Sequence, residues 1–381
     1  MTIGAAATVV GSLPVFFTAA MAVQLSAELG FGAVGIGAAV GTFFGTMAVT
    51  SLHLGRVADQ LGATLSLRIA TMGAAAAAFV IATVARNWVA LAGGLVIAGL
   101  AAALAQPAAN RLLINRISGR RLGTAFGLKQ AAPPTASMLA GLAVPAVALT
   151  VGWRWAYVLA GIGALAVAIA VGPRPPDAPV RVRRAERPKP VRLQHRSTLA
   201  VLAASFGLAF AASSVVLAFY VDSAVRAGST QQYAGLVFAA ASLTAIATRL
   251  LAGLACDRFS FAPLRLSAAL LAAGALGIGL LAAGGVTAST VGAIVALAGT
   301  WGFPGVFWYA LVRAYPDTPG RITGTMAPAA LGGIIGPIGF GAIATNVTYT
   351  LAWSLTAGLA LLAAAAMLYG ARRLAANTPQ P

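Results

Sequence analysis

The sequence predicts an all-α membrane protein in which twelve transmembrane helices form two related six-helix bundles. Apolar runs of about 20 residues recur along all 381 residues, and each can cross roughly 30 Å of hydrocarbon as a helix. Hydrophobic residues make up 60% of the chain and charged residues only 8%, whereas soluble domains carry about 25% charged residues. The segment Gly55–Asp59 (GRVAD) is also matched by Gly253–Asp257 (GLACD). This repeat predicts that one six-helix unit is used twice.

Twelve apolar runs define the expected spans. The first six lie near 6–29, 32–54, 67–85, 88–112, 122–149 and 153–172, and the second six near 198–222, 232–256, 264–283, 288–313, 321–344 and 349–370. Alternating apolar segments of about ten residues, which a membrane β-barrel requires, do not occur. The first run is too long for a signal-peptide core and a second run follows at once, so we expect it to be retained.

The predicted domains are an N-terminal bundle (1–172), a linker (173–197) and a C-terminal bundle (198–381) that ends in a short cytoplasmic tail. The linker is rich in proline and arginine, and this composition predicts an irregular cytoplasmic segment. Its charges are suited to anionic lipid headgroups. We favour the alternative that it is a solvated tether whose charge fixes the topology.

The distribution of basic residues predicts the orientation. Of the 25 Lys and Arg residues, only Arg86, Arg154 and Arg226 fall on one side of the predicted topology, and Lys129 and Arg249 fall inside spans. The remaining 20 lie on the other side. Because positive residues accumulate on the cytoplasmic side, both termini are expected in the cytoplasm and the chain in the plasma (inner) membrane as a multi-pass protein.

The composition disfavours several classes of function. The net charge of +18 is dispersed over loops between apolar helices, which argues against nucleic-acid binding. One cysteine and two histidines, His53 and His195, give no metal-binding cluster. No paired carboxylates, nucleophile–base pair or phosphate-binding GxxxxGK[ST] loop occurs, so we expect neither an enzyme nor an ATP-driven pump. The spans also lack the polar ring of a channel.

The repeated segment carries the most specific pattern. Its first copy comprises Gly55, Asp59 and Gly62, with Arg68 shortly after, and its second copy contains Arg249, Gly253, Asp257 and Arg258. The first copy resembles the signature of the major facilitator superfamily between spans 2 and 3, and the second resembles its degenerate counterpart between spans 8 and 9. With the twelve spans and the basic central linker, the resemblance covers nearly the whole chain and implies the transporter fold of that superfamily, without defining a subfamily.

A gating role follows for this segment. Glycines at 55 and 62 are expected to form a tight turn, and the Asp59 carboxylate can cap the positive end of a neighbouring helix. The resemblance implies that Asp59 latches the cytoplasmic side against the start of span 11, near residues 320–324. The alternative is a solvated residue that only sets topology. The basic pair usual after Gly62 is replaced by Ala63 and Thr64, so the latch is expected to be weaker or to use Arg68.

Span 11 contains a glycine-rich stretch with Gly336 and Pro337. Small residues let helices approach closely, and proline kinks a helix. The stretch resembles the Gly-Pro motif that drug exporters of the superfamily carry in span 5. Here it lies in span 11, and Leu95 stands where those exporters often have an arginine in span 4. Both departures argue against a proton-driven multidrug exporter, and we assign the pair a conformational role.

Two cations, Lys129 in span 5 and Arg249 in span 8, are predicted well inside the membrane. Spans 5 and 8 face each other across the cleft in the superfamily arrangement. No acidic residue lies at a similar depth in any predicted span, and a cation in hydrocarbon costs about 3 kcal/mol or more. The missing anion is therefore predicted to be the substrate. For Arg249 the alternatives are structural support of the neighbouring loop or a side chain that snorkels towards the surface.

Neutral residues complete the predicted pocket. Candidate substrate-binding residues besides the two cations are Gln24, Gln106, Asn110, Gln130, Trp301, Phe307 and Trp308. The aromatic run around Pro304 suits a binding cavity, although packing is the more usual role of such a run. Glu28 and Asp222 lie at the outer ends of spans 1 and 7, where surface anchoring is a better interpretation than proton coupling.

The sequence therefore predicts a monomeric secondary active transporter of the major facilitator type. It would work by alternating access, use no cofactor and contact membrane lipids, and a proton is the candidate coupling ion. The sharper hypothesis is a small organic anion, a monocarboxylate, neutralised by Lys129 and Arg249. The alternative is efflux of hydrophobic or drug-like compounds, which the aromatic span 10 favours.

Overall fold

A computed structural model describes residues 2–114, 124, 127, 128, 130–172, 196–259, 261–315 and 325–376, and only the backbone of residues 2 and 111–114. Within these ranges every regular element is helical. Among the described residues, eleven helices are long and apolar enough to cross a membrane, and a shorter apolar helix over 132–148 lies within the predicted fifth span. The predicted all-α membrane fold is confirmed.

The first half of the chain contains the helices that run through α8. Their bounds are α1 (Thr2–Ala20), α2 (Ala22–Leu29), α3 (Ala33–Leu61), α4 (Ala63–Val84), α5 (Trp88–Ile114), α7 (Ala132–Ala143), the π-helical turn η2 (Val144–Ala148) and α8 (Trp153–Val171). The expected first span, 6–29, is thus two helices that meet at Met21. These helices pack chiefly against one another, with α4 against α5 and α8, and α5 against α3.

The second half begins at α9. Its elements are α9 (Arg196–Arg226), α10 (Gln231–Arg258), α11 (Pro263–Ala283), α12 (Val286–Thr300), α13 (Pro304–Ala314), the 3-10 helix η3 (Ala327–Leu331), α15 (Gly332–Asn346) and α16 (Tyr349–Ala376). The helix α11 packs against α12 and α16, and α9 packs against α15 and α16. We call the two groups the N-bundle and the C-bundle.

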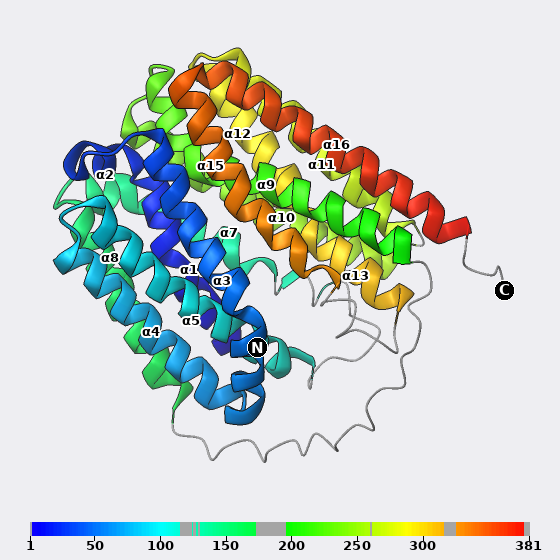
Figure 1. The fold of residues 1–381 in the computed structure, drawn as a ribbon, viewed down its shortest axis with the longest axis horizontal. Coiled ribbons are helices and arrows are strands. Elements are labelled where there is room, and N and C mark those ends of the chain that lie inside the picture. The colour runs from blue at the N-terminus through cyan, green and yellow to red at the C-terminus, as the bar shows by residue number, and fades with distance from the viewer. Residues whose placement is uncertain are drawn as a thin grey trace.

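The bundles diverge towards the ends that carry the chain termini (Figure 1). We call this the terminal end of the molecule, and the end with Leu29 and Arg226 the opposite end. Near the opposite end α3 and α15 are in direct contact: a Cβ on Gly37 would lie 2.2 Å from the Pro337 carbonyl oxygen, and one on Gly341 2.6 Å from that of Ala33. Only glycine fits this approach, which confirms that the glycine-rich stretch permits close helix packing.

A second seam joins α7 to α10. Near the opposite end a Cβ on Gly141 would lie 2.6 Å from the Gly235 carbonyl oxygen. Further along, the hydroxyls of Ser137 and Ser242 are 2.6 Å apart and hydrogen-bonded in a buried position. The bundles therefore meet backbone to backbone, with a polar pair that is satisfied between them.

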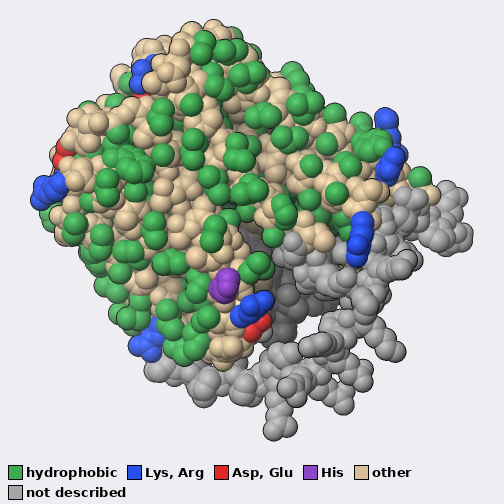
Figure 2. Space-filling view, in the orientation of Figure 1, with side chains coloured by type: hydrophobic (Ala, Val, Ile, Leu, Met, Phe, Trp, Pro, Cys, Tyr) green, Lys and Arg blue, Asp and Glu red, His purple; other side chains and the backbone are tan. Residues whose placement is uncertain are grey.

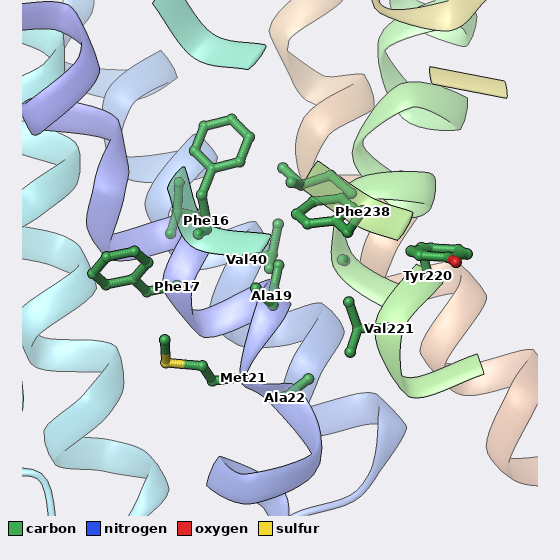
Figure 3. Close-up of a cluster of buried hydrophobic side chains, with 14 of the residues drawn as sticks. Phe16, Phe17, Ala19, Met21, Ala22, Val40, Tyr220, Val221 and Phe238 are labelled. Atoms are coloured by element: carbon green, nitrogen blue, oxygen red, sulfur yellow. The ribbon is translucent and has the colours of Figure 1, made fainter. Parts of the chain in front are cut away.

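The opposite end is closed by hydrophobic packing between the bundles. Figure 3 shows Ala19 and Ala22 on the N-bundle side of this cluster and Tyr220, Val221 and Phe238 on the C-bundle side. All five side chains are essentially inaccessible to solvent. This packing separates the middle of the molecule from the opposite end.

The molecular surface fits a bilayer. Figure 2 shows hydrophobic side chains across the visible face, with the charged side chains towards its margins. Large exposed side chains such as Leu159, Ile169 and Leu276 are more than half accessible. A surface of this kind needs an apolar environment. The chain is therefore an integral multi-pass membrane protein.

Each bundle carries a carboxylate clamp at the opposite end. In the N-bundle, Trp153 Nε1 and Arg154 Nη1 both donate to the Glu28 carboxylate. Donation by these two groups lowers the pKa of Glu28 below its ordinary value, Arg154 being the larger cause. Glu28 lies beyond the spanning part of the first helix, which is Ile3–Ala20. The predicted anchoring position of Glu28 thus has a specific partner set.

The C-bundle repeats this arrangement. The Tyr349 hydroxyl donates to the Asp222 carboxylate, and Arg226 Nε donates to the same oxygen over 2.9 Å. Tyr349 opens α16 as Trp153 opens α8. The arginine differs in position, since Arg226 lies on the same helix as Asp222, but in both bundles the first residue of the last helix donates to the carboxylate, which supports duplication of one six-helix unit.

Candidate functional site

A cavity of about 140 Å³ lies between the two bundles near the middle of the helices. Both bundles contribute side chains to its wall, from α1, α3, α5, α7, α9, α10 and the break between α12 and α13. The lining residues are Ser12, Phe16, Phe43, Phe44, Met47, Ala102, Gln106, Gln130, Pro133, Phe206, Phe210, Ser213, Arg249, Thr300, Trp301, Phe303 and Pro304. Four predicted site residues are among them: Arg249, Trp301, Gln106 and Gln130.

Arg249 is the cation that the structure places in this wall. Its residue is only 2% exposed, so the side chain does not snorkel to a surface. Its Nε donates to the Trp301 carbonyl oxygen, and its guanidinium carbon lies 5.6 Å from the centre of the Trp301 ring. Its Nη1 is buried and has no hydrogen-bond partner among the described residues. One arm of the guanidinium is thus fixed by a hydrogen bond, and another has no partner among the described residues.

The break in span 10 explains how Arg249 is held. Helix α12 ends at Thr300 and α13 begins at Pro304, which has no N–H to donate to the Thr300 carbonyl. The Ser213 hydroxyl replaces that donor at 2.9 Å, and Trp301 Nε1 donates to the Ser213 carbonyl at 3.1 Å. Because the broken helix exposes carbonyl groups, side chains of α9 and α10 satisfy them, and Arg249 is positioned as one of these donors.

The other polar groups of the wall differ in availability. The hydroxyls of Ser12 and Thr300 donate to the carbonyl oxygens of Thr8 and Ala296 in their own helices, over 2.9 and 2.8 Å. Gln106 and Gln130 are partly buried in the wall. Their amides can orient a ligand through neutral hydrogen bonds.

Aromatic rings bridge the bundles beside the cavity. Phe16 of α1 meets Trp301 edge to face with ring centres 5.8 Å apart. Phe44 of α3 meets Phe210 of α9 in the same way at 5.2 Å. Such edge-to-face pairs are favourable geometries for aromatic rings, and here each pair joins one bundle to the other.

Several predicted substrate-binding residues lie elsewhere. Gln24 is in α2 near the opposite end, where its Nε2 donates to Gln231 Oε1 of the C-bundle over 3.0 Å. Asn110 does not line the cavity, and its buried Oδ1 has no partner among the described residues. Phe307 and Trp308 pack in a cluster around Phe206 instead. The sequence assigned all four to a pocket because polar and aromatic residues in a span do not reveal the direction in which they point. Lys129 lies outside the described residues.

Sequence analysis also missed part of the wall. Phe43, Phe44, Phe206 and Phe210 line the cavity, yet a phenylalanine in an apolar helix has the same sequence signal whether it faces a cavity, lipid or the core. The only available signal was the flanking of Phe43 and Phe44 by Gly41 and Gly45, which marks a face of close helix approach.

The repeated segment differs locally from the prediction. Gly55 is not in a turn, because α3 continues to Leu61 and includes it. The turn is made by Gly62 alone, whose φ of 81° favours glycine. Arg68 is exposed on α4. The expected partner of Asp59, near residues 320–324, lies outside the described residues.

The second copy makes a contact between the bundles. Asp257, near the end of α10, accepts from the Thr124 backbone N–H over 2.8 Å and from the Thr124 hydroxyl over 2.6 Å. A Cβ on Gly127 would lie 2.6 Å from the Arg249 carbonyl oxygen and 3.7 Å from the Gly253 Cα. Gly253 thus permits close approach. Arg258, which follows Asp257, is exposed.

Two helical bundles around a central cavity, in a membrane-spanning chain, define the class of secondary transporters. The sequence profile of the Major Facilitator Superfamily matches residues 4–330, and the chain belongs to that family. Comparison with curated proteins gave no match.

Proposed function

We propose that this protein carries a small organic anion across the membrane by alternating access, with Arg249 as a substrate-binding cation. The observation that carries the proposal is the buried guanidinium, of which Nη1 has no partner in the described part of the chain. Placing a charge in a membrane interior costs about 3 kcal/mol or more. A carboxylate in the cavity offsets that cost through charge-assisted hydrogen bonds.

The size of the cavity favours a small substrate. Pockets for drug-sized ligands usually enclose about 300–1,000 Å³, whereas this cavity encloses about 140 Å³. The anion hypothesis is therefore better supported than efflux of bulky drug-like compounds. An organic monocarboxylate meets both the charge and the size.

Alternating access is supported by the distribution of contacts between the bundles. Buried side chains such as Ala22 and Val221 close the molecule at the opposite end, and α3 and α15 diverge towards the terminal end (Figure 1). From the basic residues, we assign the terminal end to the cytoplasm and the membrane to the plasma (inner) membrane. The cavity then exchanges substrate with the cytoplasm, and the duplicated bundles rock to open it on the other side.

Uptake of radiolabelled monocarboxylates into proteoliposomes tests the proposal. Arg249→Gln should raise KM by roughly 30-fold or more, because loss of one partner of a buried charge pair costs about 2 kcal/mol or more. Arg265→Gln removes an exposed arginine and should leave uptake unchanged. Lys129→Ala tests the second predicted cation and should also reduce uptake. Full retention of anion uptake by Arg249→Gln would remove the hypothesis.

A structural role for Arg249 must be separated from a binding role, because its Nε also holds the Trp301 carbonyl. Arg249→Lys keeps the charge without the guanidinium fork. If Arg249 binds substrate, Arg249→Lys should retain part of the uptake that Arg249→Gln loses at comparable thermal stability. If Arg249→Lys and Arg249→Gln lose uptake equally and lose thermal stability in parallel, Arg249 has only a structural role.

A further inference from the structure

We infer that the preferred substrate is an aromatic monocarboxylate, whose carboxylate pairs with Arg249 and whose ring packs among the phenylalanines of the cavity wall. This inference rests on the proposed function and narrows the class of anion. Its basis is the unusual composition of the wall around Arg249, whose Nη1 has no partner among the described residues.

Aromatic side chains are concentrated in the wall. They make up 8% of the chain but seven of the 17 residues that line the cavity. The hydroxyls of Ser12 and Thr300 are engaged with carbonyls of their own helices. The surface offered to a ligand beyond Arg249 and the two glutamines is therefore predominantly aromatic. A small hydrophilic acid would leave that surface without a partner.

The arrangement of the rings suits a planar guest. Phe206 and Phe210 are stacked with their planes 22° apart and their centres 6.5 Å apart. Phe210 also meets Phe44 edge to face. A ligand ring beside these residues finds both faces and edges, the two geometries that aromatic pairs prefer.

The charge and the rings are connected. Trp301 lies against the Arg249 guanidinium, as described above, and its ring also meets Phe16 of the other bundle. A carboxylate bound at Nη1 is thus adjacent to aromatic surface from both bundles. An aromatic acid would contact the C-bundle through its charge and both bundles through its ring, so its binding would couple the two bundles.

Three probes of similar size and one small anion separate the contribution of the charge from that of the ring. Benzoate carries both, cyclohexanecarboxylate the charge with an aliphatic ring, benzamide the ring without charge, and acetate the charge alone. Binding to the purified full chain is measured by thermal shift and by quenching of tryptophan fluorescence. Benzoate should bind more tightly than cyclohexanecarboxylate, by about 2- to 10-fold, and acetate and benzamide should bind weakest.

Variants of the cavity wall test whether its phenylalanines cause the preference for benzoate. Phe210→Leu should weaken benzoate binding by about 2- to 10-fold and leave cyclohexanecarboxylate nearly unchanged. Phe259→Leu alters a ring that is 65% exposed and serves as the matched control. If Phe210→Leu is unstable, Phe206→Leu provides the same comparison from the neighbouring turn of α9.

The outcomes distinguish this inference from the function on which it rests. Equal affinity for benzoate and cyclohexanecarboxylate, with loss of both in Arg249→Gln, would overturn the aromatic preference and leave anion transport intact. Benzamide binding as tightly as benzoate would overturn the anion proposal itself. Tight benzoate binding that both Arg249→Gln and Phe210→Leu weaken is the expected result.

Discussion

Asp257 of the C-bundle accepts two hydrogen bonds from Thr124, one from its backbone N–H over 2.8 Å and one from its hydroxyl over 2.6 Å. The second copy of the repeated segment therefore contacts the other bundle through a carboxylate that accepts from a backbone N–H, the kind of contact expected of Asp59 in the first copy. This contact lies near the end of α10, at the terminal end of the α7–α10 seam.

Removing this carboxylate should open the terminal end further. Charge-assisted hydrogen bonds contribute about 1.5–3 kcal/mol. Asp257→Asn should therefore shift the conformational equilibrium towards the form with the wider terminal end by roughly tenfold or more. The readout is the labelling rate of a Ser12→Cys thiol in the cavity by an impermeant reagent, on a Cys256→Ser background that removes the single native cysteine. Thr124→Val should have a smaller effect, since the backbone N–H remains. Arg258→Gln is the control, and an unchanged rate in Asp257→Asn would contradict the latch.

The opposite end should respond to Gln24. Its hydrogen bond to Gln231 joins the bundles, and a neutral hydrogen bond contributes about 0.5–1.5 kcal/mol. Gln24→Ala and Gln231→Ala should each increase labelling of the same thiol from the opposite side by about 2- to 10-fold. Gln232→Ala changes an exposed neighbour and should have no effect. Faster labelling from the terminal side alone would contradict this assignment.

The α7–α10 seam should not tolerate a methyl group. Gly141→Ala places a Cβ 2.6 Å from the Gly235 carbonyl oxygen, and overpacking of this kind costs about 1–3 kcal/mol. We expect a clear drop in the thermal unfolding temperature in detergent. Gly163→Ala is the matched control, because a Cβ there has no neighbour within 4 Å. Equal unfolding temperatures of Gly141→Ala and Gly163→Ala would contradict the prediction, because they would show that the α7–α10 seam accommodates a methyl group.

The Glu28 clamp predicts a specific dependence of stability on pH. Because the folded-state pKa of Glu28 is lowered from 4.5, its stabilising contribution is present above that pH and is lost as the pH falls through the lower, folded value. Glu28→Gln should therefore lower the unfolding temperature at neutral pH and flatten its dependence on pH below about 4.5. A parallel acid profile in the variant and the native protein would contradict the prediction.

The fold could be predicted because its cause is local. Each span requires only a long apolar run, and the match between Gly55–Asp59 and Gly253–Asp257 indicated the duplication. The helix breaks were less accessible. Pro304 indicated the interruption of span 10, whereas no residue type indicated the break at Met21 or the continuation of α3 through Gly55.

The candidate site could be predicted only where chemistry restricts position. Arg249 was found because a cation in an apolar helix is costly and needs a partner or a cavity. Phe206 and Phe210 were missed and Phe307 lies outside the cavity wall, since aromatic residues in a span occur facing lipid, core or cavity alike. Their directions depend on the rotation of each helix within the bundle.

The sequence by itself determined the class of protein, the positions of most spans and the buried charge, because hydrophobicity and charge are properties of the residues. Only the tertiary structure decided which side chains meet across the bundles: Asp257 with Thr124, Gln24 with Gln231, and Arg249 with the broken end of α12. These pairs lie far apart along the chain. The distances within these pairs are fixed by helix packing at glycine and alanine contacts. No local sequence pattern encodes that packing.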